Sequence, residues 1–267
     1  MLSWKAKNLR TEDVFLKVES CPESTCYKIK QNFLNTNAGF VICDFNNFSD
    51  PYDFFLKTCE HLGQKIPQNI NKDLIVIVED KGDTLENSGR YHKSNAAGIA
   101  HTDCPQWAEV PKYMTLFCVN NSPTGGESKF VSAIEVYNVI KKEKPQYLET
   151  LCSDFYFDKR GEIIEGESPV TTAPIFSFDK GRLNFRFLDT YIESGHALKN
   201  SPLTKEQLSA FNYLKSVMSR EDLNYLFKLK PGQAVFCNNL CVAHGRKKFY
   251  DSPESKRRMI RFWIKDE

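Results

Sequence analysis

The sequence lacks the features that would place it in a membrane or on nucleic acid. No run of about 18 apolar residues occurs in the 267-residue chain, so no transmembrane helix is predicted. Charges of the two signs nearly cancel, with 36 Lys and Arg against 34 Asp and Glu. This balance gives no reason to expect nucleic acid or a membrane surface as a partner. The first residues also lack the apolar core of a secretory signal.

Cysteine is present but follows no paired pattern. The nine residues are an odd number, and the closest pairs, Cys21 with Cys26 and Cys237 with Cys241, lack the two-residue gap of common zinc sites. Scattered cysteines of this kind are typical of reduced thiols. We therefore expect a cytoplasmic protein without a disulfide framework.

Nothing in the sequence divides the chain into separate domains. It contains no internal repeat, no low-complexity tract and no Gly/Ser-rich linker. We expect a single domain over residues 1–267, with a helical insertion at roughly 195–228. Strand-like and helix-like segments do not alternate strictly, which argues against a doubly wound parallel sheet. The pattern favours an α+β fold that is mainly β, with a double sheet and flanking helices.

Individual segments carry local structural signals. Ser49 is predicted as the N-cap of a helix that has Pro51 in its first turn, and Thr204 with Gln207 predicts a capping box. A Pro-Thr-Gly-Gly turn predicts a hairpin within 113–130. Expected strands lie at 38–45, 73–80, 257–267 and after the turn that opens 229–246; expected helices lie at 49–63, 131–142 and 201–218.

His101 and Asp103 lie two residues apart in a chain that has only five histidines. Residues i and i+2 of a strand face the same side, so both side chains can reach one ion. His244 is the best candidate for a third ligand, because it ends an apolar strand and precedes a glycine. Two histidines and one carboxylate form the facial triad of non-haem Fe(II) sites, which leaves positions open for a cosubstrate and O₂.

A hydroxyl and several arginines further along the chain suit an anionic cosubstrate. Ser128 follows a glycine turn, and Arg257, Arg258 and Arg261 lie in the C-terminal strand. An arginine fork binds a carboxylate better than the point charge of a lysine does. Alternation along a strand puts Arg257 and Arg261 on one face and Arg258 on the other.

In this order, the motifs resemble the taurine dioxygenase-like (clavaminate synthase-like) family of Fe(II)/2-oxoglutarate-dependent oxygenases. The resemblance rests on "HTD", "GGESKF", "NNLCVAHGR" and "RRMIRFW"; it covers about residue 98 to the C-terminus, with no matching motif between about 154 and 225. It implies a double-stranded β-helix (jelly-roll) core. It also implies iron held by His101, Asp103 and His244, with 2-oxoglutarate and O₂ as cosubstrates.

The resemblance implies roles for the downstream residues as well. The family usually has a threonine where this chain has Ser128, and its hydroxyl binds the far carboxylate of 2-oxoglutarate. The arginine for that carboxylate is expected at Arg257, with Arg258 as the alternative, and Arg261 is expected near a substrate carboxylate. Related halogenases have a small residue in place of Asp103, so halogenation is disfavoured. Hydroxylation is expected, with desaturation as the alternative.

The substrate pocket is expected from residues before the iron loop and from a later strand. Tyr91, His92 and Asn95 precede His101, in a segment that often contacts substrate in the family. Arg186 is a candidate for binding a substrate carboxylate. These groups suit a small anionic or zwitterionic substrate, such as an amino acid or a derivative of one.

Two other classes of protein stay open at this point. A non-catalytic binding protein on the same scaffold would keep the pocket without turnover, but the intact triad, Ser128 and the arginines favour an enzyme. A thiol enzyme would use Cys104 or Cys237 with a histidine, and no separate base is evident for it.

Overall fold

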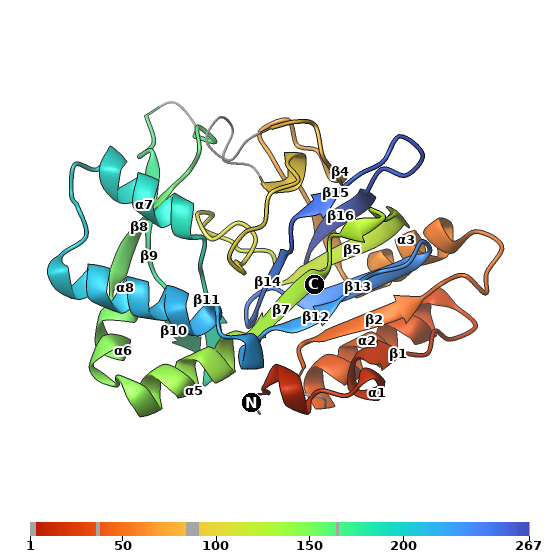
Figure 1. The fold of residues 1–267 in the computed structure, drawn as a ribbon, viewed down its shortest axis with the longest axis horizontal. Helices are drawn as coiled ribbons and strands as arrows, with labels where there is room; N and C mark the ends of the chain where they lie inside the picture. Colours follow the sequence, from red (N-terminus) through yellow and green to blue (C-terminus); the bar gives the residue numbers. More distant parts are fainter. Residues whose placement is uncertain (1–3, 36–37, 84–90, 164–165, 267) are drawn as a thin grey trace.

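The computed structural model describes residues 4–35, 38–83, 91–163 and 166–266 (Figure 1). Its largest sheet has seven strands in the order β1-β2-β13-β5-β16-β3, with β4 paired to β16. Apart from the parallel pair β1–β2, the pairings in this sheet are antiparallel. The strands are β1 (Phe15–Leu16), β2 (Phe40–Asp44), β3 (Gln64–Ile66), β4 (Val76–Glu79), β5 (Tyr113–Asn120), β13 (Gln233–Asn238) and β16 (Arg258–Lys265).

Helices α2 (Pro22–Asn35) and α3 (Pro51–Leu62) pack on one face of this sheet. In β13, Phe236 points toward the helices, and its ring lies 5.6 Å from that of Phe55 in α3. Its neighbours Val235 and Cys237 belong to the buried cluster on the opposite face. Successive residues of a strand face opposite sides. Because both sides of β13 are covered, this strand is apolar throughout instead of alternating with polar residues.

A smaller sheet lies against that opposite face. It contains β12 (Tyr225–Phe227), β7 (Ser128–Ser132) and β14 (Val242–Arg246), in this order. Phe130 of β7 packs edge-on against Phe40 of β2, with ring centroids 4.7 Å apart, and Val242 of β14 joins the same buried cluster. Two facing sheets with flanking helices are the α+β architecture that the sequence predicts.

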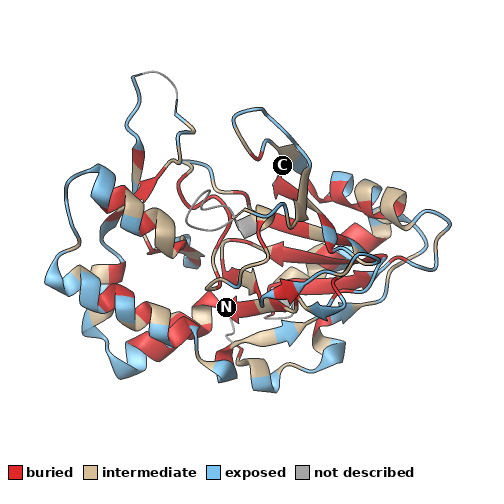
Figure 2. Ribbon diagram, turned by 45° about the horizontal axis from the view of Figure 1, so that its top comes forward, coloured by how far each residue is buried: buried red, intermediate tan, exposed pale blue. Residues whose placement is uncertain are grey.

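Four helices and two hairpins form a further lobe beside the small sheet (Figure 1). Figure 2 shows buried residues along their inward sides and exposed residues on their outer turns. No helix within the described ranges is long and apolar enough to cross a bilayer. The lobe contains α5 (Ala133–Glu143), α6 (Gln146–Leu151), α7 (Asp189–Leu198), α8 (Lys205–Met218), β8 (Asp154–Asp158), β9 (Val170–Pro174), β10 (Phe176–Asp179) and β11 (Arg182–Phe185). The remaining short elements are η1 (Ala6–Asn8), α1 (Thr11–Val14), η2 (Tyr91–Lys93), η3 (Glu221–Leu223), β6 (Thr124–Gly125) and β15 (Phe249–Tyr250).

The structure confirms one of the two predicted helix N-caps and corrects the other. Thr204 and Gln207 form the predicted capping box, because each side chain accepts the other residue's backbone N–H at 3.1 Å. At α3 the cap is Asp50 and not Ser49. Pro51 is the first helical residue, so the residue directly before it takes the cap position, and the Asp50 carboxylate accepts the N–H groups of the next turn.

The hairpin predicted within 113–130 is wrong. β5 lies in the large sheet and β7 in the small one, so the intervening turn carries the chain from one sheet to the other. Gly125 allows this crossing: its φ is +72°, and a Cβ atom there would lie 2.1 Å from the carbonyl oxygen of Lys248. The helical stretch expected at 195–228 also differs, because α7 begins at Asp189 and Tyr225–Phe227 is strand β12 of the small sheet.

Gly195 sets how closely α7 lies on β8. A Cβ atom at this position would lie 2.3 Å from the carbonyl oxygen of Tyr156 and 2.8 Å from the amide nitrogen of Asp158. Both are backbone atoms, so a larger residue must displace the helix. We expect Gly195→Ala to lower the free energy of unfolding by roughly 1–3 kcal/mol in equilibrium urea titrations. Ser216→Ala, on the exposed side of α8, should stay within about 0.5 kcal/mol of wild type. Equal losses in the two variants would contradict this account.

Candidate metal centre and its two cavities

His101 and His244 lie directly opposite each other in an isolated antiparallel bridge. The backbone N–H of each residue donates to the carbonyl oxygen of the other, and both N···O distances are 2.8 Å. His244 belongs to β14, while His101 comes from the loop that precedes β5. The bridge holds the two imidazole rings side by side, with centroids 5.0 Å apart.

Directly after His101 the backbone makes no strand pairing. Polar contacts hold the next two residues, Thr102 and Asp103, in place. The Thr102 N–H donates to the Phe187 carbonyl at 2.9 Å, and the Thr102 hydroxyl accepts the Phe187 N–H at 3.0 Å. Asn239 then clamps Asp103. Its side-chain oxygen accepts the Asp103 N–H at 2.7 Å, and its amide donates to the carbonyls of Asp103 and Pro111, both at 3.0 Å. The two predicted ligands thus come together through these contacts, and not through the extended strand that the i, i+2 argument assumed.

The three side chains converge on one point. Their ligand atoms all lie within 4.8 Å of one another. Nε2 of His101 is 4.0 Å from one Asp103 carboxylate oxygen, and Nε2 of His244 is 3.7 Å from the other. Burial, with a contribution from His244, lowers the pKa of His101 to about 4. The ring is therefore neutral near pH 7 and offers a lone pair, so the donor set fits a two-histidine, one-carboxylate iron site.

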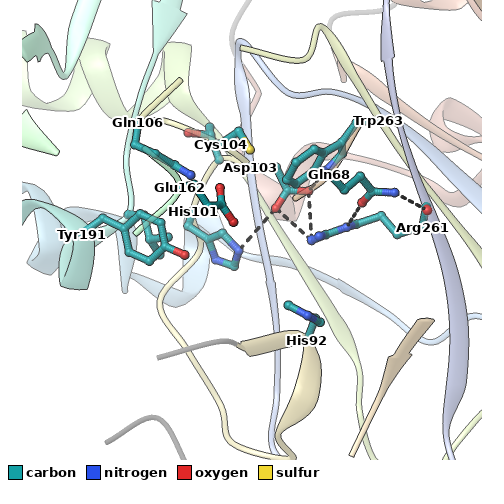
Figure 3. Close-up of a pocket in the computed structure, with 12 residues that line it drawn as sticks. Gln68, His92, His101, Asp103, Cys104, Gln106, Glu162, Tyr191, Arg261 and Trp263 are labelled. Atoms are coloured by element: carbon teal, nitrogen blue, oxygen red, sulfur yellow. Dashed lines mark hydrogen bonds and ion pairs between the residues drawn. The ribbon is translucent and has the colours of Figure 1, made fainter. Parts of the chain in front are cut away.

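Groups from β16 orient the Asp103 carboxylate from the other side (Figure 3). Trp263 Nε1 donates to it at 2.6 Å, and Arg261 Nη1 lies 3.2 and 3.4 Å from its two oxygens. Arg261 is held in turn by Gln68, whose side-chain oxygen accepts the Nε–H at 2.8 Å. Burial opposes ionisation of Asp103, but Arg261 and the histidines outweigh it and hold the pKa of the carboxyl far below its usual range. Asp103 is therefore ionised near pH 7.

One cavity connects the triad to a group of cations, and we call it the Arg257 cavity. Its lining includes His101, His244, Ser128, Arg246 and Arg257. The register of β14 against β7 pairs His244 with Phe130 and Arg246 with Ser128. Because side chains two residues apart share a face, all four point to the same side of the small sheet.

Arg257 is the most enclosed charge in this cavity. The residue is 2% exposed, and its Nε and Nη1 have no hydrogen-bond partner among the described residues. Burial, followed by the nearby charge of Arg246, lowers its pKa to about 10. It is still protonated near pH 7, so the cavity holds an incompletely satisfied guanidinium that a carboxylate would match.

The structure separates the two arginines that the sequence leaves as alternatives. The side chain of Arg258 is 53% exposed, lies 3.8 Å from Glu79 and does not line the cavity. Arg257 and Arg261 both line it, as strand alternation predicts. Arg246 was not among the predicted residues. It could have been found, because it stands two residues after His244 and so faces the same side of the strand.

A second cavity also reaches His101 and Asp103, and we call it the Glu162 cavity (Figure 3). Its lining includes Gln68, Arg261 and Trp263 on one side of Asp103, and Glu162 and Tyr191 on the other. His92 lines both cavities and therefore stands where they meet. Glu162 and Gln68 lie in segments where the sequence offered no motif, so no signal pointed to them.

The other predicted substrate residues are placed differently. Tyr91 begins η2, and its side chain lies outside the described part of the structure. Asn95 lines neither cavity, and its backbone carbonyl accepts the Phe249 N–H at 3.3 Å. Arg186 also lines neither cavity, because its guanidinium is directed at the loop after Asp103. It donates to the carbonyls of Pro105, Trp107 and Ala108 at 2.8–3.3 Å. It therefore positions this loop.

The structure argues against the thiol-enzyme alternative. Cys104 and Cys237 are both buried, and burial raises the pKa of each thiol well above its usual value. Burial therefore disfavours the thiolate that a nucleophile requires.

With this geometry in view, comparison with known proteins identifies the family. The sequence pattern of the family described as "Taurine catabolism dioxygenase TauD, TfdA family" matches residues 39–263. The chain belongs to this family. The resemblance inferred from the four motifs is thereby confirmed.

The relatives found by sequence comparison are only distantly related to this chain. FR-33289 synthase of Streptomyces rubellomurinus is 28% identical over 213 residues, which are 78% of this chain and 61% of that protein. Human gamma-butyrobetaine dioxygenase is 25% identical over 177 residues, which are 60% of this chain and 42% of that protein. The chain thus spans about two fifths to three fifths of the length of these relatives.

Solved structures confirm the jelly-roll core expected of the TauD, TfdA family. An asparagine oxygenase in complex with Fe(II), 2S,3S-3-hydroxyasparagine and succinate has a TM-score of 0.70 at 15% identity, covering 90% of this chain and 79% of that one. The non-heme iron oxygenase OrfP in complex with Fe and alpha-ketoglutaric acid has a TM-score of 0.69 at 13% identity, covering 92% and 81%.

Asn239 offers a direct test of how the triad is built. Replacing it by alanine leaves the backbone groups of Asp103 and Pro111 buried without partners. We expect Asn239→Ala to lower the free energy of unfolding by about 2–4 kcal/mol and to weaken Co(II) binding about 10-fold or more. The measurements are urea unfolding of the metal-free protein and anaerobic Co(II) titration. Asn212→Ala, on the exposed face of α8, serves as the control. Unchanged Co(II) affinity in Asn239→Ala would show that the Asn239 contacts do not fix the position of the Asp103 carboxylate.

Proposed function

We propose that this protein is an Fe(II)- and 2-oxoglutarate-dependent oxygenase that hydroxylates or desaturates a small anionic or zwitterionic molecule, such as an amino acid or a derivative. One observation carries the proposal. A single cavity, lined by the two histidines of the His101, Asp103 and His244 cluster, reaches Ser128 and the buried, incompletely satisfied Arg257. Membership of the TauD, TfdA family supports it.

In this proposal, the two histidines and Asp103 hold Fe(II). The bound metal supplies the redox chemistry with O₂, and the protein supplies positioning and a closed, charged pocket. For hydroxylation, a substrate C–H bond, 2-oxoglutarate and O₂ yield the C–OH product, succinate and CO₂. The Asp103 carboxylate occupies the ligand position that a halogenase leaves to chloride, which supports oxygenation over halogenation.

Arg257 and Ser128 are the proposed partners of the far carboxylate of 2-oxoglutarate. Arg257 provides the charge and the fork geometry, and Ser128 a hydroxyl donor. Arg246, opposite Ser128 on β14, adds positive charge to the same cavity. Arg261 and His92 remain the proposed substrate contacts from the sequence, because both line the Glu162 cavity beside the metal ligands.

A cytoplasmic location is proposed as well. All nine cysteines are free, as expected of thiols in a reducing compartment. The names of the relatives support an oxygenase, since they include gamma-butyrobetaine dioxygenase and Uridine-5'-phosphate dioxygenase.

The proposed activity is tested by succinate formation. With Fe(II), O₂ and 2-oxoglutarate, we expect succinate release that rises when a compound from a panel of amino acids, N-modified amino acids and small sulfonates is added. His101→Ala should abolish it, because a two-ligand site does not retain the metal. Absence of succinate with the whole panel would favour a non-catalytic binding protein, and full activity in His101→Ala would refute an iron centre at this site.

Two adjacent arginines provide a matched pair for the cosubstrate site. Arg257→Ala should raise the KM for 2-oxoglutarate about 10- to 100-fold, since it removes a charge-assisted pair from a buried pocket. Arg258→Ala removes an exposed charge and should leave that KM within about two-fold of wild type. Steady-state succinate assays over a range of 2-oxoglutarate concentrations measure both values. The reverse order of effects would assign the cosubstrate to Arg258.

A further inference from the structure

Glu162 brings a carboxylate into the cavity beside the metal ligands. It lies in the connection between β8 and β9, after a tight turn in which the Glu162 N–H donates to the Lys159 carbonyl at 2.9 Å. Arg160 and Gly161, the central residues of this turn, have φ values of +55° and +74°. Positive φ at both central positions is typical of a type I′ turn. The backbone that leads to Glu162 is therefore sharply bent and defined.

Two tryptophans connect the Glu162 carboxylate to the Asp103 carboxylate. Trp107 Nε1 donates to Glu162 at 3.3 Å. The Trp107 ring packs edge-on against Trp263 at a centroid distance of 5.5 Å, and Trp263 donates to Asp103. Glu162 is thus held at a set place relative to the triad, and the Tyr191 hydroxyl points toward the same space in Figure 3.

The Glu162 cavity has opposite charges on its two sides. In Figure 3, Glu162 and Tyr191 lie on one side of Asp103, with the Glu162 carboxylate next to His101, and Arg261 lies on the other side. Arg261 directs Nε at Gln68 and Nη1 at Asp103. Its Nη2 has no hydrogen bond to the residues that the structure describes, and we assign it to the carboxylate of a ligand. A molecule that spans this cavity meets an anion at one end and a cation at the other.

We propose that Glu162 selects substrates that carry a protonated nitrogen, which it binds while a carboxylate of the same molecule lies toward Arg261. This inference rests on the proposed function and narrows its substrate class from anionic or zwitterionic to zwitterionic. A charge-assisted hydrogen bond to an ammonium favours such a substrate. The same carboxylate repels a purely anionic one, so Glu162 discriminates in both directions.

Binding measurements test this assignment without relying on turnover. The probes are the free proteinogenic amino acids and the N-acetyl form of each, in which the ammonium is replaced by an uncharged amide. Their affinities are measured by anaerobic calorimetry on protein loaded with Fe(II) and 2-oxoglutarate. We expect at least one amino acid to bind wild type about 10-fold or more tighter than its N-acetyl form.

Substitution then assigns the preference to one carboxylate. Glu162→Gln should weaken binding of that amino acid about 10- to 100-fold and leave its N-acetyl form unchanged or tighter. Glu167→Gln removes an exposed carboxylate from the same loop and serves as the matched control, which should behave as wild type. Equal thermal midpoints for the variants exclude misfolding as the cause.

Two outcomes would overturn the assignment. One is that no amine of the panel binds wild type more tightly than its N-acetyl form. The other is that Glu162→Gln leaves the ratio of the two affinities unchanged. Failure of the proposed function is seen separately, as absence of succinate, and the binding ratio reports on Glu162 even then.

Discussion

The backbone bridge between His101 and His244 is the constraint on which the rest of the site depends. Two 2.8 Å hydrogen bonds fix a loop residue against the small sheet, so both imidazoles face the same space. From there, alternation along β14 places Arg246 on the same face as His244, and the register with β7 places Ser128 beside it. The metal ligands and the cosubstrate cations are thus positioned by one local piece of sheet geometry.

The two cavities beside this bridge differ in the charges of the side chains that line them. In the Arg257 cavity, two buried guanidiniums lie close enough for one to lower the pKa of the other, which favours a ligand with a carboxylate. In the Glu162 cavity, Arg261 is partly engaged by Asp103, and Glu162 adds negative charge. This difference in charge supports the proposal that the anionic cosubstrate and a zwitterionic substrate take different cavities. His92, which lines both cavities, stands at their boundary.

Sequence reasoning succeeded where a period or a motif carried the information. The spacing of Arg257, Arg258 and Arg261 anticipated which side chains face inward, and Thr204 with Gln207 formed the expected cap. It failed where the role of a residue depends only on contacts with residues far away in the chain. Arg186 was expected to bind a substrate carboxylate, yet its guanidinium donates to loop carbonyls about 80 positions away in the chain. The hairpin at 113–130 failed because a Gly-Gly turn also serves to pass between sheets. Glu162 lies in no motif, and Asn239 lies in the "NNLCVAHGR" motif without a period that would reveal its role as a clamp.

Strand β16 connects this chemistry to the stability of the fold. Its inward-facing residues include Met259, Arg261 and Trp263, which lie toward the small sheet and the triad. Its intervening residues Phe262 and Ile264 pack in the cluster beneath α2 and α3. Because a strand moves as a unit, a change in packing beneath the helices is transmitted to the groups that hold the Asp103 carboxylate. The helices on the far side of the large sheet therefore support the metal centre, although none of their described residues lines either cavity.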